Sequence, residues 1–106
     1  MRNIASLLST SSQVASETAL TTVTSTKGKL YQITGFDGCS NDQSFKVELK
    51  FGSTVKLIMQ GSADTTVGRD FGDNGPVTGV DESVTVLTTP AATGQCTANL
   101  IYKVIF

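Results

Sequence analysis

The sequence has no histidine and no tryptophan among its 106 residues. Histidine is the commonest general base, so its absence excludes a Ser-His-Asp or Cys-His catalytic site. Cys39 and Cys96 cannot complete a zinc site by themselves, because such a site needs four nitrogen or sulfur ligands. Without tryptophan, an aromatic platform for stacking on sugars has little support. We therefore expect a chain with no catalytic activity, no cofactor and no bound transition metal.

Charged residues are also scarce, at 16% of the chain, and the net charge is −1. The eight Lys and Arg residues are scattered from Arg2 to Lys103 and form no basic patch for nucleic acid. No apolar run is long enough to span a bilayer. From these absences we expect that neither nucleic acid nor a membrane is a partner of this chain.

What the chain has instead is hydroxyl groups and short apolar alternations. About a quarter of its residues are Ser or Thr, well above ordinary usage. The clearest alternation runs from Phe45 to Phe51, and Gly52-Ser53 then turns the chain into a second alternating run, Thr54–Gln60. We predict a hairpin whose inward residues are Phe45, Val47, Leu49, Phe51, Val55, Leu57 and Met59. The residues expected to form the core are Phe45, Val47, Leu49, Val55, Leu57, Val86 and Tyr102.

Further strands are predicted over 19–25, 29–36, 83–89 and 97–106. Asp37-Gly38 and residues 40–42 have the composition of turns. The segment from Gly61 to Glu82 is rich in glycine and acidic residues, with short strands expected near 67–71 and 77–80. About seven or eight strands without a helix predict an all-β fold, an antiparallel β-sandwich or jelly roll over residues 18–106.

The last strand presents large apolar groups on both faces, because Leu100, Tyr102 and Val104 alternate with Ile101 and Ile105. A strand of this kind belongs inside a sheet, or it meets the core on one face and a partner chain on the other. We therefore predict that both the fold and a subunit contact depend on it.

Residues 1–17 are predicted to be an extended N-terminal arm. A short apolar patch is followed by the polar run Ser9–Gln13, which is typical of a tail that needs a neighbour to hold it. The predicted partner-contact residues come from both ends of the chain, namely Ile4, Leu7, Leu8, Ile101, Ile105 and Phe106.

Two features are left open by the residues. Cys39 and Cys96 either form a disulfide that closes a long loop or remain two buried, unpaired thiols. The acidic residues between 64 and 82 are calcium-type oxygen ligands or ordinary turn residues, and their spacing does not match an EF-hand. A host-receptor contact by this segment is equally open.

The stretch from Gly28 to Phe36 (GKLYQITGF) resembles the "GKLYxIxGxN" strand of small β-sandwich virion proteins of tailed bacteriophages. In those proteins an alternating hairpin follows, then an "FG…G" segment, a Thr-rich strand and an aromatic-ended strand. Here Phe71–Val77, Ser83–Thr89 and Cys96–Tyr102 come in that order, so the resemblance covers residues 27–102. The acidic turns at 37–42 and the apolar extension at 103–106 depart from the pattern.

The resemblance implies a capsid decoration (cement) protein on the capsid surface of a virion. It would be a homotrimer that binds the major capsid protein and stabilises the shell, with the N-terminal arm as a clamp. The alternatives are another phage head or tail component (fibre, neck or adaptor) and a secreted ligand-binding β-sandwich module. An enzyme is the least supported class, because only scattered carboxylates favour it.

Overall fold

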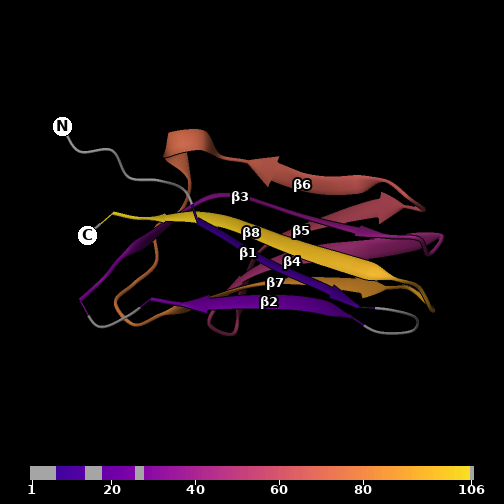
Figure 1. Ribbon diagram of the computed structural model, residues 1–106, viewed down its shortest axis with the longest axis horizontal. Coiled ribbons are helices and arrows are strands. Elements are labelled where there is room, and N and C mark those ends of the chain that lie inside the picture. The colour runs from indigo at the N-terminus through magenta and orange to yellow at the C-terminus, as the bar shows by residue number, and fades with distance from the viewer. Residues whose placement is uncertain (1–6, 14–17, 26–27, 106) are drawn as a thin grey trace.

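The computed structural model describes residues 7–13, for which it gives the backbone, together with residues 18–25 and 28–105. Eight strands form two four-stranded antiparallel sheets that pack face to face (Figure 1). In order along the chain, the elements are β1 (Leu7–Gln13), β2 (Ala19–Thr24), β3 (Tyr31–Ser40), β4 (Ser44–Phe51), β5 (Thr54–Ser62), β6 (Thr66–Asp70), the 3-10 turn η1 (Gly72–Asn74), β7 (Ser83–Pro90) and β8 (Cys96–Val104). The predicted all-β sandwich is confirmed.

The first sheet, called sheet A here, has the order β1-β8-β3-β6, and the second, sheet B, has the order β2-β7-β4-β5. β8 is therefore an interior strand of sheet A, as its apolar composition predicts. Its inward residues Cys96, Ala98 and Leu100 are fully buried, while Ile101 alternates to the outer face. The core between the sheets also contains Ile33, Phe36, Val47, Leu49, Val84 and Val86.

The β4–β5 hairpin is confirmed, but one of its predicted core residues is wrong. Phe45, Val47 and Leu49 are buried, whereas Val55 is 40% exposed. A β-bulge lies between the pairs Leu49–Leu57 and Lys50–Val55, so the alternation of β5 shifts there and Val55 joins Lys50 on the outer face.

Two of the other expected core residues, Leu57 and Tyr102, are partly buried at the margin of the core. Leu57 lies on β5, which is an edge strand and is covered from one side. The Tyr102 ring packs on Tyr31 with 4.9 Å between the ring centroids.

The turn predicted at Asp37-Gly38 is also wrong, because β3 continues through it to Ser40. A Cβ at Gly38 would collide with the Thr88 hydroxyl and a Val47 methyl across the sandwich. The glycine therefore permits close approach of the sheets, and it is not required by a turn. A second bulge, at Thr34, places Phe36 on the buried face with Ile33, whereas uninterrupted alternation would put the two residues on opposite faces.

Seven residues of the predicted N-terminal arm, Leu7–Gln13, are strand β1, which pairs with β8 along its whole length. This pairing uses backbone groups, so it does not require apolar side chains in β1. Residues 1–6 and 14–17 of the predicted arm lie outside the described residues.

Within the glycine-rich segment, β6 confirms the short strand expected near 67–71. Near 77–80 the structure has a single bridge, between Val77 and Gln32. No helix in the described part of the chain has the length and hydropathy needed to cross a membrane.

Candidate binding groove on the outer face of sheet A

An open groove of about 620 Å³ lies on the outer face of sheet A, over β8, β3 and β6. The pairing register brings two rows of residues together there, Ile101–Gly35–Asp70 and Asn99–Asp37–Gly68. The groove is lined by Thr34, Gly35, Phe36, Asp37, Gly68, Arg69, Asp70, Gly72, Asp73, Ile101 and Lys103.

Glycines open the groove. Gly35 and Gly68 leave two positions of its floor without side chains, so backbone is exposed where neighbouring strands would carry bulk. A Cβ at Gly68 would collide with the Phe36 carbonyl, and one at Gly35 would lie 3.2 Å from the Arg69 carbonyl oxygen. The close approach of β6 to β3 therefore requires glycine at 68, and the same residue hollows the surface.

Asp37 is held in the middle of the groove by a cross-strand partner. The Asn99 amide donates to its Oδ1 at 2.5 Å, and both residues are half-buried. A cross-strand pair of this kind fixes the side chain in one orientation without neutralising its charge. One carboxylate oxygen is thereby occupied, and the second is left to accept another hydrogen bond.

Lys103 and Asp73 form an ion pair at one end of the groove, with 2.7 Å between Nζ and Oδ1. The Lys103 side chain is 18% exposed, whereas that of Asp73 is 89% exposed. The hydrogen bond from Lys103, followed by the attraction of its charge, lowers the pKa of Asp73 from its ordinary value of 3.8. The Lys103 ammonium is thus held in the groove wall by the solvent-exposed carboxylate of Asp73.

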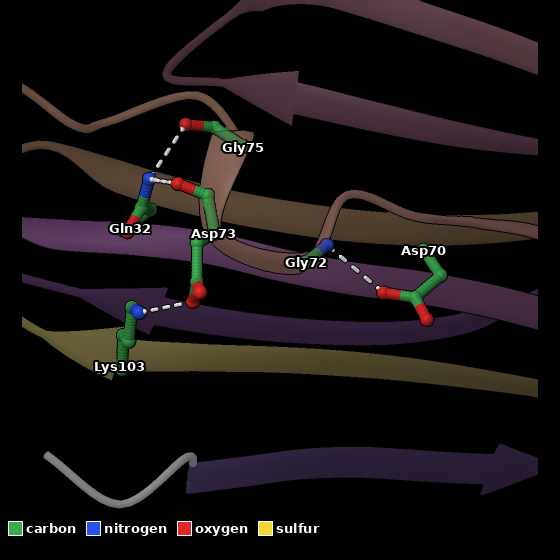
Figure 2. Close-up of polar contacts among 6 residues, drawn as sticks. All are labelled: Gln32, Asp70, Gly72, Asp73, Gly75 and Lys103. Carbon is green, nitrogen blue, oxygen red and sulfur yellow. Dashed lines mark hydrogen bonds and ion pairs between the residues drawn. The ribbon is translucent and has the colours of Figure 1, made fainter. Parts of the chain in front are cut away.

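The turn that carries Asp73 is tied down on both sides (Figure 2). Gln32 Nε2 donates to the carbonyl oxygens of Asp73 and Gly75, at 2.9 and 3.2 Å, and the Gly72 amide donates to Asp70 Oδ1 at 2.9 Å. A Cβ at Gly75 would collide with the Ile33 carbonyl, so the turn lies directly on β3. This rim of the groove is held in place by these bonds before any ligand arrives.

One buried polar atom borders the groove. The Thr34 hydroxyl oxygen, at the bulge in β3, is buried and has no hydrogen-bond partner among the described residues. The neighbouring Thr34 carbonyl accepts from the Phe71 amide at 2.8 Å, so the backbone at this bulge is satisfied while the side chain is not.

Four of the predicted partner-contact residues, Leu7, Leu8, Ile101 and Ile105, lie in the described part of the chain, and their contact with a partner stays a prediction. Ile101 lines the groove, and Ile105 lies at the end of β8, where its amide donates to the Leu30 carbonyl. Leu7 and Leu8 pair with Tyr102 and Ile101 in the β1–β8 register. The two remaining positions, Ile4 and Phe106, lie outside the described residues.

Of the two alternatives for the cysteines, the disulfide is not formed. Cys39 pairs with Thr97 and Ser40 pairs with Cys96, so the two cysteines fall at adjacent positions of the register and point to opposite faces of sheet A. Both thiols are free, Cys96 buried in the core and Cys39 half-buried on the outer face. The alternative of two unpaired thiols is correct, although one of them is not fully buried.

The acidic residues between 64 and 82 do not form a metal cluster. Among the described residues, no three His, Cys, Asp or Glu side chains are close enough to hold an ion together. Asp70 and Glu82 instead accept hydrogen bonds from backbone amides of their own turns, those of Gly72 and Gly79. Asp70 and Glu82 therefore have the turn-forming role that was the alternative to cation binding.

The groove was not predicted from the sequence, because its residues have the local patterns of turns and of an apolar strand end. Gly35 and Gly68 are indistinguishable from turn glycines until the strand register is known. Asp37 and Asn99 are 62 residues apart in the chain, and they meet through the β3–β8 pairing. Lys103 was included in the apolar extension after the last strand, with no indication that it pairs with Asp73.

No protein-family profile and no curated protein sequence matches this chain. Among solved structures, it is similar to the CBM36-1 domain of a multidomain xylanase from the hindgut metagenome of Trinervitermes trinervoides. The TM-score is 0.51 at 16% identity, over 96% of this chain and 98% of that domain. At this identity the likeness shows a shared β-sandwich fold.

Two further likenesses have lower TM-scores and add nothing to this. One is to a carbohydrate-binding module CBM36 in complex with calcium and xylotriose, with a TM-score of 0.44 and 10% identity over 89% of this chain and 78% of that one. The other is to the insecticidal delta-endotoxin Cry8Ea1 from Bacillus thuringiensis, with a TM-score of 0.46 and 10% identity over 89% of this chain and 19% of that one. None of the three is named as a virion protein, and the expected homotrimer, capsid partner and virion location stay predictions.

Proposed function

We propose that this chain is a non-catalytic binding module that holds a polyhydroxylated ligand, an oligosaccharide segment, in the groove of sheet A. The observation that carries the proposal is the composition of the groove, in which acceptor and donor side chains surround an open backbone floor. The shared fold with a domain of a xylanase supports the same choice of ligand class.

Sugar hydroxyls both donate and accept, so a site for them needs groups of both kinds. The Asp37 and Asp70 carboxylates accept, while the Lys103 ammonium and the Arg69 guanidinium donate. Three carboxylates and two cations line the groove, a near balance that suits a neutral ligand better than a highly charged one.

The apolar part of the site is small. Ile101 lies on the outer face between Gly35 and the β1 backbone, and it offers an aliphatic surface to the C–H face of a sugar ring. Among the described residues that line the groove, the one aromatic residue is Phe36, which belongs to the core at 2% exposure and offers no flat ring to a ligand. Affinity therefore depends mainly on hydrogen bonds, and we expect it to be weak for one sugar and stronger for several in a row.

The proposal is tested by titrating the protein with xylohexaose, cellohexaose and mannohexaose while following amide NMR shifts. We expect shifts at Gly35, Gly68 and Ile101, and saturation with at least one oligosaccharide. Asp37→Asn and Asp70→Asn keep an oxygen acceptor for Asn99 and Gly72 but remove a charge, and each should weaken binding by about tenfold.

A matched control is Asp64→Asn, which makes the same change at an exposed residue that does not line the groove. This variant should bind like the parent chain. Shifts confined to sheet B, or no binding of any of the three oligosaccharides at millimolar concentration, would rule the proposal out. Binding to undecorated phage capsids in that second case would favour the virion role expected from the resemblance.

A further inference from the structure

β5 is an edge strand with few of the features that normally protect such edges. It runs for nine residues, Thr54–Ser62, and pairs with β4 on one side. An exposed edge presents unpaired backbone donors and acceptors, and proteins usually protect it with charge or short length. Lys56 is the one charged residue of β5, whereas the five-residue β6, at the same side of the sandwich, carries both Arg69 and Asp70.

The middle of β5 is apolar on both faces. Ile58 lies on the outer face of sheet B opposite Glu48 and is 54% exposed. Leu57 and Met59 point inward but are partly buried, because no strand covers the far side of β5 among the described residues. A further strand placed along this edge would cover all three side chains.

We propose that β5 pairs with β5 of a second copy of this chain, antiparallel and centred on Ile58. The argument is the self-complementarity of the sequence Lys56–Gln60 about that residue. A twofold axis at Ile58 places Leu57 of each copy opposite Met59 of the other and Lys56 opposite Gln60. Apolar residues then meet apolar residues on both faces, and no like charges lie directly opposite each other.

The pairing joins the four strands of sheet B in each copy into one continuous eight-stranded sheet. The β-bulge at Lys56 limits its length, because it interrupts the alternation between Val55 and Leu57. Lys56 also lies over the Phe51 ring, with Nζ 5.8 Å from the ring centroid, so its charge is turned toward its own chain. The contact is therefore short, and the dimer is expected to dissociate on dilution.

The test is sedimentation of the purified chain over a concentration series reaching the millimolar range. The parent should pass from monomer to dimer, and Ile58→Lys should raise the dissociation constant at least about tenfold, because two ammonium groups would then face each other at the axis. Leu20→Lys is the matched control, because it makes the same kind of change at a 47% exposed position on β2, which is the opposite edge of sheet B. It should dimerise like the parent.

Circular dichroism and urea unfolding of both variants establish that each is folded before its mass is compared. A parent that stays monomeric throughout the series would overturn the proposal, and so would a trimer, since a twofold contact cannot close one. Equal weakening of the dimer by the two substitutions would also overturn it, and so would an unchanged dissociation constant in both variants. This inference is independent of the groove, which lies on the other sheet.

Discussion

Asp73 and Lys103 are an ion pair whose two members experience different surroundings. Because the folded pKa of Asp73 is lowered, the contribution of this pair to stability is complete above pH 3.8 and is lost as the pH falls through the lowered value. We expect a carboxyl NMR titration of Asp73 to show a midpoint below 3.8 and to move toward 3.8 at high salt. Lys103→Met should return the midpoint to 3.8, and an unchanged midpoint in that variant would contradict the pairing.

Leu49 and Val55 belong to one hairpin but differ completely in burial. Leu49 is fully buried between the sheets, so Leu49→Ala should lower the free energy of unfolding by about 2–5 kcal/mol. Val55→Ala removes a 40% exposed side chain and should cost less than about 1 kcal/mol. Urea unfolding of the two variants measures the difference. Equal losses would mean that the bulge does not turn Val55 outward.

At the scale of elements, removal of β1 tests whether this strand stabilises the sandwich or contributes as little as a loose arm would. Deleting residues 1–17 removes β1 and leaves the outer edge of β8 unpaired over seven residues. Since each lost backbone bond is worth about 1 kcal/mol net, we expect the free energy of unfolding to fall by at least about 2 kcal/mol. Deleting residues 1–6 leaves β1 in place and serves as the control. If both deletions unfold at the same urea concentration, β1 contributes little to the sandwich.

The strands were predictable where alternation is regular. β4 alternates apolar and charged residues without interruption, and its inward set was correctly identified. β3 and β5 each contain a bulge, at Thr34 and Lys56, and each bulge reverses the faces that a simple period of two assigns. A bulge depends on how two strands fit together, so a single strand's sequence does not reveal it.

The candidate site could not be predicted for a related reason. Asp37 and Gly38 have the composition of a turn. Their local sequence does not indicate that Gly38 allows the opposite sheet to pack closely against β3. The polar residues of the groove come from β3, β6, η1 and β8, and they converge only when the pairing order is known. Topology of this kind is set by the whole core, which sequence periodicity does not specify.

At the scale of the whole molecule, the two proposals use different parts of the sandwich. An antiparallel pairing along β5 keeps each sheet facing the same way in both copies, so both grooves would open on the same side of the dimer. Two such sites could engage one polymer chain at once, and the second contact would be favoured by high effective concentration. A polymeric ligand would then bind more tightly than a short oligosaccharide does.

The position of β8 inside sheet A has a consequence for how the protein folds during its synthesis. Of the described strands, β1 is made first, but its partner in sheet A is β8, which leaves the ribosome after the other seven. Until then β1 has no strand to pair with and β3 lacks one of its neighbours, so sheet A cannot close. The β4–β5 hairpin is local and can form early, whereas the two-layer sandwich has to wait for β8. A nascent chain stalled before residue 96 should therefore remain open to proteases that the finished protein resists.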